Sequence, residues 1–248
     1  MLSNEIAEIC GIHVGDGYLR NDGRRREWDI SGNIEEKSYY NKHVIPLFNK
    51  IFDLDIKGRF FKGRNTYGFV IRKKEVIEFA HEKLQFPYGK KSTIIKIPDF
   101  IIKKKFLIPS FLRGYFDTDG HIGFTKKINN SSHFKKNKDY YPRISCATVS
   151  QELSKEISNI LKCLNFNFTL YKYNPKKKTE NLSYNIQISG VPNLKKWLKT
   201  VGVKNPTKNS RILIWEKFGF CPTNTTYSQR LNILKGTLNP NSLNGPVT

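Results

Sequence analysis

The chain has 248 residues, and its apolar content of 38%, with 13% aromatic residues, is too high for a disordered protein and allows a sizeable core. Lys and Arg outnumber Asp and Glu by 43 to 21, so the formal net charge of +22 favours a polyanionic partner, nucleic acid before a membrane surface or an acidic protein. No apolar run is long enough to span a membrane, no signal-peptide pattern opens the chain, and the four cysteines include no CxxC pair. We therefore expect a cytoplasmic protein without a zinc site.

The first half of the chain shows the order helix, two strands, helix, two strands, helix. Its first helix can be capped by Ser3 or Asn4 and carries an apolar stripe at helical spacing. Gly11 and Gly15 lie four residues apart on this helix and leave a flat track that another backbone can approach closely. The expected helices cover residues 4–15, 35–52 and 74–84, and the expected strands cover 18–20, 27–33, 55–62 and 66–72.

The second half repeats this order. Its expected helices cover residues 106–118, 151–164 and 191–201, and its expected strands cover 121–126, 143–148, 168–173 and 183–189. A further helix is expected over 210–218, and the Pro-, Asn- and Gly-rich residues after it are expected to be extended. We therefore divide the chain into a first repeat (1–85), a linker (86–105), a second repeat (106–203) and a C-terminal helix with an extended tail (204–248).

One nine-residue pattern opens each half of the chain. Residues 9–17 and 112–120 both run from an apolar residue through a glycine and bulky residues to Asp-Gly. A single Asp-Gly pair indicates only a turn. Two copies, each ending a predicted helix and each followed by a predicted strand, indicate a duplicated unit with a shared role.

The pattern resembles the LAGLIDADG homing endonuclease family in its single-chain, two-repeat form. The second motif, Arg113 to Gly120, is a close match, whereas the first has Val14 where the family often has an acid and His13 in place of an aliphatic residue. The resemblance covers about residues 4–218. It implies an α+β fold, a pseudo-twofold duplication of αββαββα in which two antiparallel, saddle-like sheets are joined by the paired LAGLIDADG helices.

The resemblance also implies a function, that of a monomeric, intron-encoded homing endonuclease that needs no protein partner. Such an enzyme hydrolyses both strands of a double-stranded DNA site with divalent metal, reads a long target in the major groove and leaves short 3′ overhangs. Two alternatives stay open, a splicing maturase that binds intron RNA and a DNA-binding protein that has lost cleavage. Both Asp-Gly pairs are present, which argues against lost cleavage. An intein is not expected, because the chain begins Met1-Leu2 and lacks the His-Asn end of protein splicing.

The two motif aspartates are the candidate metal ligands. Phosphodiester hydrolysis needs a polarised phosphate and an activated water, which divalent ions can supply, and Mg²⁺ prefers carboxylate and phosphate oxygens. Asp16 and Asp119 would lie together at the ends of two paired helices, and the carbonyls of Gly15 and Thr118 could add coordination. The resemblance implies two or three Mg²⁺ ions shared between the halves, with Mn²⁺ as a substitute. Asp117 has no acidic counterpart, so we expect it to have a structural role.

The resemblance further implies a basic catalytic residue at the start of the third helix of a repeat. Lys74 is the best match, and its alternative roles are a phosphate contact or a solvated helix start. The matching stretch around Pro192 has no lysine, which suggests unequal halves. Asn33 and Ser150 are loose candidates for positioning water.

Strands with polar residues at every second position indicate a face that reads DNA, because side chains alternate between the two faces of a sheet. Basic turns indicate phosphate contacts, with a solvated loop as the alternative, and binding should weaken with salt. The candidate DNA-binding residues are Arg20, Arg24, Arg25, Arg26, Asp29, Ser31, Asn33, Lys57, Arg59, Lys62, Arg64, Tyr67, Arg72, Lys126, Arg143, Ser145, Tyr171, Tyr173, Lys176, Lys177, Asn185 and Gln187.

Overall fold

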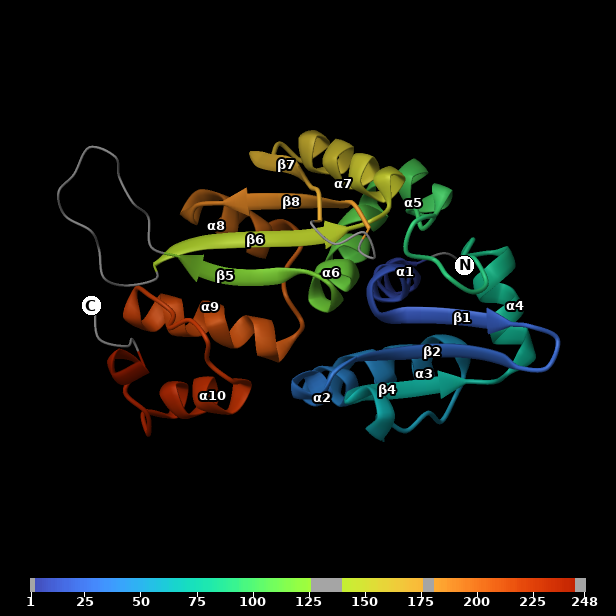
Figure 1. Cartoon of the computed structure of the whole chain (residues 1–248), viewed down its shortest axis with the longest axis horizontal. Coiled ribbons are helices and arrows are strands. Elements are labelled where there is room, and N and C mark those ends of the chain that lie inside the picture. Colours follow the sequence, from blue (N-terminus) through green and yellow to red (C-terminus); the bar gives the residue numbers. More distant parts are fainter. Residues whose placement is uncertain (1–2, 126–139, 176–180, 244–248) are drawn as a thin grey trace.

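The computed structural model describes residues 3–125, 140–175 and 181–243. These residues form two four-stranded antiparallel sheets, with strand orders β1-β2-β4-β3 and β5-β6-β8-β7. The two sheets lie on either side of a central helix pair, and further helices lie behind them (Figure 1). The predicted duplication of αββαββα is confirmed. No helix within the described ranges is both long enough and apolar enough to cross a membrane.

The first half follows the predicted order. Its elements are α1 (Asn4–Asp16), β1 (Gly17–Asn21), β2 (Arg26–Asn33), η1 (Ile34–Glu36), α2 (Lys37–Tyr39), η2 (Tyr40–Val44), α3 (Ile45–Phe52), β3 (Arg59–Phe61), η3 (Lys62–Arg64), β4 (Thr66–Ile71) and α4 (Lys74–Glu82).

Two elements of the first half differ from their predicted form. The helix expected over 35–52 is continuous, but it starts as a 3₁₀ turn and becomes π-helical over Tyr40–Val44, next to Pro46, whose nitrogen cannot donate a hydrogen bond. Strand β3 is shorter than predicted because the backbone of Ile56 is hydrogen-bonded to a side chain. Ile56 N donates to the Asn49 side-chain oxygen at 2.9 Å, and the Asn49 amide nitrogen donates to Ile56 O at 3.2 Å. These bonds hold the residues before β3 against α3 instead of against β4.

The second half repeats the order and continues into C-terminal helices. Its elements are α5 (Asp99–Lys103), η4 (Lys105–Leu107), α6 (Ile108–Thr118), β5 (His121–Thr125), β6 (Tyr141–Thr148), α7 (Gln151–Cys163), β7 (Phe168–Tyr173), β8 (Ser183–Ser189), α8 (Val191–Thr200), α9 (Pro206–Phe218), α10 (Tyr227–Lys235) and η5 (Pro240–Leu243).

The C-terminal segment is more helical than expected. Helix α9 starts at Pro206, and helix α10 forms within the segment expected to be extended. Thr226 and Gln229 make a capping box at the start of α10, and Gly236 ends it in the left-handed conformation. Arg230 of α10 is 1% exposed and donates to Ser210 of α9 at 2.9 Å, so the two helices form one packed unit.

Each sheet has one face against the core and one open face. In β2, Trp28 and Ile30 are fully buried, while Asp29 and Ser31, which alternate with them, are partly exposed. Strand β8 shows the same alternation of buried isoleucines with partly exposed polar residues. The helices cover the core face of both sheets, so the polar positions of both halves lie on the same side of the molecule (Figure 1).

Helices α1 and α6 cross at backbone contact in the centre of the molecule. A Cβ atom on Gly11 would overlap the carbonyl oxygen of Phe111, and a Cβ atom on Gly114 would overlap that of Glu8. Gly15 lies equally close to the Thr118 side chain. The glycine track predicted from the sequence is therefore the surface through which the two repeats join.

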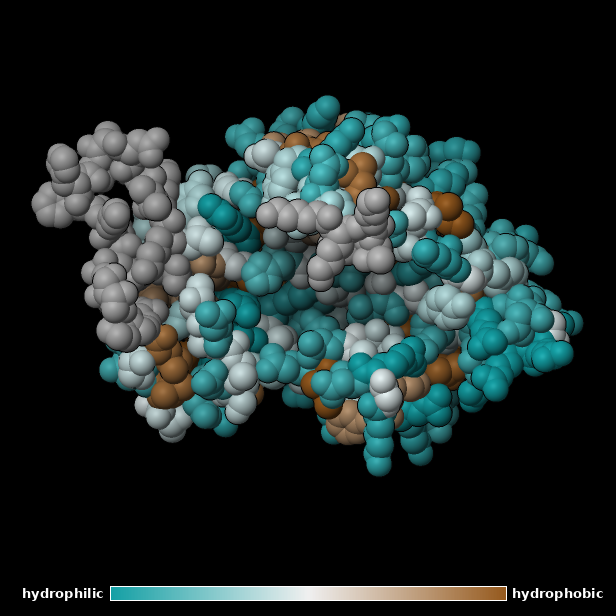
Figure 2. Space-filling view, in the orientation of Figure 1, coloured by the Kyte–Doolittle hydropathy of each residue, from teal (hydrophilic) through white to brown (hydrophobic). Residues whose placement is uncertain are grey.

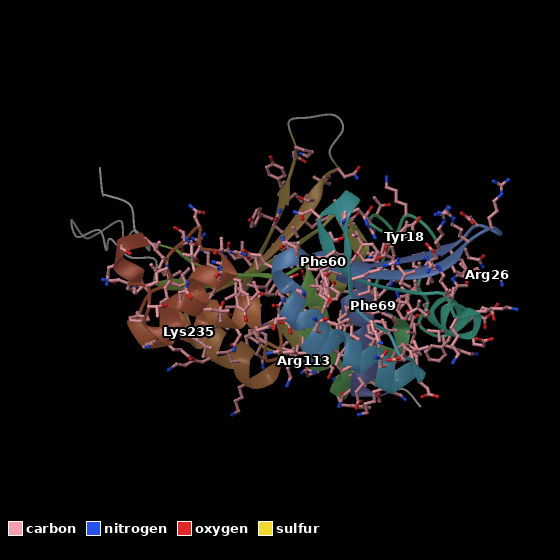
Figure 3. All side chains as sticks on the ribbon, turned by 90° about the horizontal axis from the view of Figure 1, so that it is seen from below. Tyr18, Arg26, Phe60, Phe69, Arg113 and Lys235 are labelled. Atoms are coloured by element: carbon pink, nitrogen blue, oxygen red, sulfur yellow. The ribbon has the colours of Figure 1, made fainter. Side chains whose placement is uncertain are left out.

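A buried ion cluster ties the same two helices together. Glu8 of α1 is 4% exposed and accepts from Arg113 of α6 at 2.6 and 3.1 Å and from His43 at 2.6 Å. Burial raises the pKa of Glu8, but hydrogen bonds from His43 and Arg113 outweigh it, and the net pKa lies below the usual value. Arg113 lies on the side of the molecule opposite Tyr18 of the open face (Figure 3).

We predict that Gly114→Ala lowers the free energy of unfolding by about 1–3 kcal/mol, because the new methyl group meets backbone of α1 that cannot move without opening the crossing. Urea denaturation of both proteins measures the difference. Gly63→Ala is the control, since a Cβ atom at Gly63 meets nothing within 4 Å. Equal stability of the Gly114 variant and the parent would contradict the close approach.

We predict that Glu8→Gln destabilises the protein at pH 7 by about 3 kcal/mol, because it leaves the buried part of Arg113 without its counter-charge. The folded-state pKa of Glu8 is depressed, so its contribution is complete above the unfolded pKa near 4.5 and disappears as the pH falls through the folded pKa. The gap between variant and parent should therefore close in acid. Glu5→Gln, an exposed acid on the same helix, should show almost no gap at either pH.

Candidate active site

The two motif aspartates lie together where α1 and α6 end. Asp16 is the last residue of α1, and Asp119 directly follows α6. Burial, and then the charge of Asp119, raise the pKa of Asp16 to about 7. Asp119 presents part of its side chain to solvent, yet surrounding protein atoms desolvate the carboxylate and raise its pKa against the opposing charges of Lys91 and Lys208. The structure therefore brings together the carboxylate pair that the duplicated motif predicted.

A third carboxylate, which the sequence analysis did not single out, lies beside Asp16. A Cβ atom on Gly32 would meet Asp16 Oδ2, the Tyr40 hydroxyl and Glu36 Oε2, so these three groups converge over one glycine. Tyr40 donates to Asp16 Oδ2 at 2.6 Å, and Asn205 donates to Glu36 Oε1 at 2.7 Å. Burial raises the pKa of Glu36. Its position at the first turn after β2 is the signal that could have identified it.

Asn33 and Ser150, the loose candidates for positioning water, serve as helix caps. Asn33 accepts from Glu35 N at 2.9 Å at the start of η1. Ser150 accepts from Leu153 N at 3.1 Å at the start of α7 and donates to Ile95 O at 2.6 Å. Ser150 is fully buried, and its hydroxyl is engaged in these two hydrogen bonds.

Two lysines, Lys208 buried and Lys91 half-buried, lie against the carbonyl ends of the motif helices. Lys91 Nζ, from the linker, donates to the carbonyls of Val14 at 2.6 Å and Gly15 at 2.9 Å, and also contacts the His13 carbonyl. Lys208 Nζ, from α9, donates to the carbonyls of Phe116 and Thr118, both at 2.7 Å. A cation at the carbonyl end of a helix is favoured by the helix dipole.

Burial lowers the pKa of both lysines, and it lowers that of Lys91 to about 8. The nearby carboxylates of Asp16 and Asp119 oppose this shift in each case. The two lysines also donate hydrogen bonds to the carbonyl oxygens of Gly15 and Thr118, which we had expected to be available to a metal ion. Those carbonyl oxygens bind ammonium groups in this structure.

Lys74, the basic residue chosen from the sequence, lies elsewhere. Its side chain is 58% exposed at the start of α4, where it faces Glu78 at 3.7 Å. The lysines that contact the motif helices, Lys91 and Lys208, lie outside the four-strand repeats in segments with no local motif. Only the tertiary fold brings them to the aspartates.

Asp117 has the structural role expected of it. Its carboxylate accepts from the backbone nitrogens of Lys204 at 2.7 Å and Asn205 at 3.2 Å, and its carbonyl accepts from the Asn205 side chain. Burial raises its pKa to about 7. These bonds anchor the start of α9, the helix that carries Lys208.

Two pockets flank the carboxylate pair. One is lined by Gly15, Lys91, Asp119 and Thr148, and the other by Glu36, His121, Lys208 and Arg211. Each pocket thus pairs a lysine with a carboxylate. The face that carries the open strands is hollowed between the two halves, and hydrophilic residues line the hollow (Figure 2).

The carboxylates suit a hard divalent ion. Asp16, Asp119 and Glu36 supply only oxygen donors. The pKa values of Asp16 and Asp119 are raised, and a bound cation would lower them toward the usual value. Within the part of the chain that the structure describes, no group of three or more His, Cys, Asp or Glu side chains is placed to hold one metal ion together. An ion here would take its remaining ligands from phosphate and water, which is the usual arrangement for Mg²⁺.

The open face of the first sheet carries much of the predicted DNA-binding set. Several of its charges are already paired, including Asp29 with Arg64 at 2.7 Å and Arg72 with Glu27 at 2.7 Å. Arg20 pairs with Asp22 through a 2.7 Å hydrogen bond. The exposed predicted residues of this half are Arg24, Arg25, Arg26, Asn33, Lys57, Arg59, Lys62, Arg64 and Arg72. Arg26 lies at the far end of the β1–β2 hairpin (Figure 3).

Tyr67 is a correction to the predicted DNA-binding set. Its side chain is 5% exposed on the core face of β4, and its hydroxyl donates to Asn41 at 2.8 Å. The register explains this, because Tyr67 pairs with Gly32 and so shares the buried face with Phe69. An aromatic residue in a half-buried strand belongs to the core face unless the register places it outside.

The open face of the second sheet carries the predicted polar rows. Arg143 pairs across strands with Ser189, and Ser145 pairs with Gln187. Tyr171 pairs with Asn185, and Tyr171 and Tyr173 are 49% and 53% exposed. Three predicted residues, Lys126, Lys176 and Lys177, lie outside the described residues.

Comparison with known proteins identifies one domain family and one fold. Residues 107–202 match the model of the LAGLIDADG-like domain. The chain is similar to the I-LtrWI LAGLIDADG homing endonuclease bound to target DNA, with a TM-score of 0.54 and 14% identity over 96% of this chain and 98% of that one. It is similar to I-DmoI in complex with DNA and Mn, with a TM-score of 0.53 and 16% identity over 80% and 96% of the two chains. It is also similar to the N-terminal LAGLIDADG domain of WhiA, with a TM-score of 0.50 and 17% identity over 82% and 83%.

The curated relatives are much longer proteins. The chain is 30% identical over 213 residues to a replication factor C small subunit of Methanocaldococcus jannaschii, covering 85% of this chain and 10% of that protein. It is 29% identical over 213 residues to a probable translation initiation factor IF-2 of the same organism, covering 84% of this chain and 16% of that protein. The chain thus spans between a tenth and a fifth of the length of the curated relatives it matches.

Proposed function

The chain carries a LAGLIDADG-like domain and has the LAGLIDADG homing endonuclease fold, and on that premise we propose that it is a site-specific, metal-dependent double-strand DNA endonuclease. The observation that carries the proposal is the pair of carboxylates, Asp16 and Asp119, at the crossing of two helices beneath a hollow, polar face. The net charge of +22 supports a DNA partner, and structures of similar fold are described with DNA bound.

In this proposal Asp16, Asp119 and Glu36 hold divalent ions, Mg²⁺ by preference and Mn²⁺ as a substitute. When bound, the ions polarise the scissile phosphate and lower the pKa of an attacking water. Lys91 and Lys208 hold positive charge beside the carboxylates, where they can stabilise charge that develops on the phosphate oxygens. Because burial lowers the pKa of Lys91 to about 8, its ammonium group can also give up a proton near physiological pH.

The two flanking pockets suit two strands of one duplex. One pocket offers Lys91 and Asp119 and the other offers Lys208 and Glu36, so in this proposal each takes one scissile phosphate. Side chains of the open sheet faces then read bases along the major groove, and the basic turns contact phosphates on either side. Cleavage on both strands across this crossing leaves short 3′ overhangs in our proposal.

The curated relatives support a homing role. A segment of about 210 residues recurs within longer proteins whose names describe unrelated functions. A site-specific endonuclease promotes the copying of its own coding segment into a cut site, which accounts for such a distribution.

The second candidate is binding without cleavage. The match to a LAGLIDADG domain of WhiA, at a TM-score close to those of the endonucleases, supports it, since the fold alone does not require the reaction. Binding of intron RNA belongs to the same class. A competition experiment in Ca²⁺, with a labelled DNA duplex against a structured RNA, separates these partners by their relative affinities.

We predict that the parent cuts a defined site within a randomised plasmid library in Mg²⁺ or Mn²⁺, and that Asp16→Asn or Asp119→Asn slows cutting by about 10²–10³-fold. Each substitution removes a negative charge that holds the ions but leaves the shape of the side chain. DNA binding measured in Ca²⁺ should persist in both variants. If the parent binds the duplex and cuts no site with either metal, the second candidate replaces the first.

We predict that Lys91→Met and Lys208→Met each slow single-turnover cleavage by about 10²-fold, because each removes a cation beside the carboxylates. Lys74→Met should cut at the parental rate, since Lys74 is solvent-exposed and faces Glu78. Circular dichroism melts identify any variant that has lost its fold. Normal cutting by both the Lys91 and the Lys208 variant would contradict the role proposed for these lysines, and slow cutting by the Lys74 variant alone would restore the assignment made from the sequence.

A further inference from the structure

Helices α9 and α10 lie beside the second sheet, and the residues that the structure describes place no matching helix pair beside the first. The segment that brings Lys91 to the site is an irregular linker that runs past β1, where Gly89 N donates to Leu19 O at 2.8 Å. The segment that brings Lys208 to the site is helix α9, which runs past β5 and stacks Trp215 on Phe124. Figure 1 shows α9 and α10 below β5, on the side of the second sheet away from β7.

A pocket joins this helical unit to the open face of the second sheet. One wall is the sheet itself, with Arg143, Ser145 and Gln187. The opposite wall is the loop between α9 and α10, with Thr223 and Asn224, both exposed. The loop therefore extends the polar surface beyond the four strands, on this half of the molecule alone among the described residues.

Arg211 of α9 connects this pocket with the active site. It is half-buried and lines both the pocket against the sheet and the pocket that holds Glu36 and Lys208. No acid lies within ion-pair distance of its guanidinium in the described part of the chain, in contrast to Arg20, Arg64 and Arg72 on the first half.

The pocket around Arg211 holds the bases His121, Lys208 and Arg230 as well as the acids Glu35 and Glu36. Burial first, and then the charge of Arg211, lower the pKa of His121 and that of Arg230. Arg230 donates to neutral groups, namely hydroxyls and carbonyls of Ser210, Thr225 and Thr207. A half-buried guanidinium that has no acid at ion-pair distance among the described residues and is open to a pocket favours an external anion.

We propose that the α9–α10 unit is part of the DNA interface and that Arg211 binds a backbone phosphate next to the scissile position on the second half. The inference rests on the proposed function, since it places DNA across the open faces. The guanidinium fork suits two phosphate oxygens at once. The loop at Thr223 and Asn224 then borders the same strand, so the DNA contact of the second half reaches further than that of the first.

The test measures binding of a fluorescein-labelled 30-base-pair duplex of mixed sequence in Ca²⁺, at several salt concentrations. A phosphate contact adds about one unit to the slope of log K against log salt. We expect Arg211→Gln to weaken binding roughly tenfold and to reduce the slope by about one. Arg211→Lys should keep the slope and lose part of the affinity, because an ammonium group keeps the charge without the fork. Lys217→Gln, an exposed cation of the same helix that lines neither pocket, is the control for net charge.

A second pair of variants tests the loop independently of Arg211. Thr223→Glu puts a negative charge on the exposed loop and should weaken binding severalfold, whereas Ser228→Glu, exposed on α10 outside the pocket, should not. Parental affinity and slope in both Arg211→Gln and Thr223→Glu would overturn the inference while leaving the endonuclease proposal intact. A parent that binds no duplex at any salt concentration would sink the endonuclease proposal itself.

Discussion

The backbone contact between α1 and α6 is the constraint on which the rest of the molecule depends. Gly11 and Gly114 let the two helices approach so closely that neither glycine position has room for a methyl group. Helices that cross at ordinary side-chain distance would hold their last residues several ångströms further apart. The close crossing is what lets one aspartate raise the pKa of the other, and it makes one site from two repeats.

That proximity carries an electrostatic cost, and the chain offsets it from outside the repeats. Two carboxylates at the carbonyl ends of two helices meet the negative ends of both helix dipoles as well as each other. Lys91 and Lys208 lie against those helix ends, and Tyr40 donates to Asp16. The lysines are themselves desolvated, so burial disfavours the charged form of the lysines as well as that of the carboxylates. A bound cation would stabilise the charged carboxylates, and a bound phosphate would stabilise the charged lysines. Charged groups whose pKa values are shifted by burial and by each other are typical of active sites.

Local periodicity predicted most of the fold from the sequence. The strand bounds of β7 and β8 and the duplicated order of elements followed from alternation and from the repeated motif. The pairing of Asp16 with Asp119 followed from the duplication. Tyr67 was assigned to the wrong face because the alternation of β4 is ambiguous until its register with β2 is known. Helix α10 was missed, although its capping box was present in the sequence, because the surrounding composition resembled a loop.

The residues of the proposed site that the sequence analysis did not single out come from different parts of the chain. Lys91 and Lys208 reach the site from segments that have no repeat, no motif and no common spacing, so only the packing of distant elements brings them there. Glu36 lies within the first repeat, at the first turn after β2. The two lysines perform matching roles on matching helices, yet one comes from an irregular linker and the other from a helix. A duplicated core therefore constrains where positive charge must lie, and leaves free which segment supplies it. In the second half this segment is helix α9, which packs with α10 beside the sheet and carries Arg211. The asymmetry of the site thus arises in what surrounds the crossing, while the crossing itself stays close to twofold.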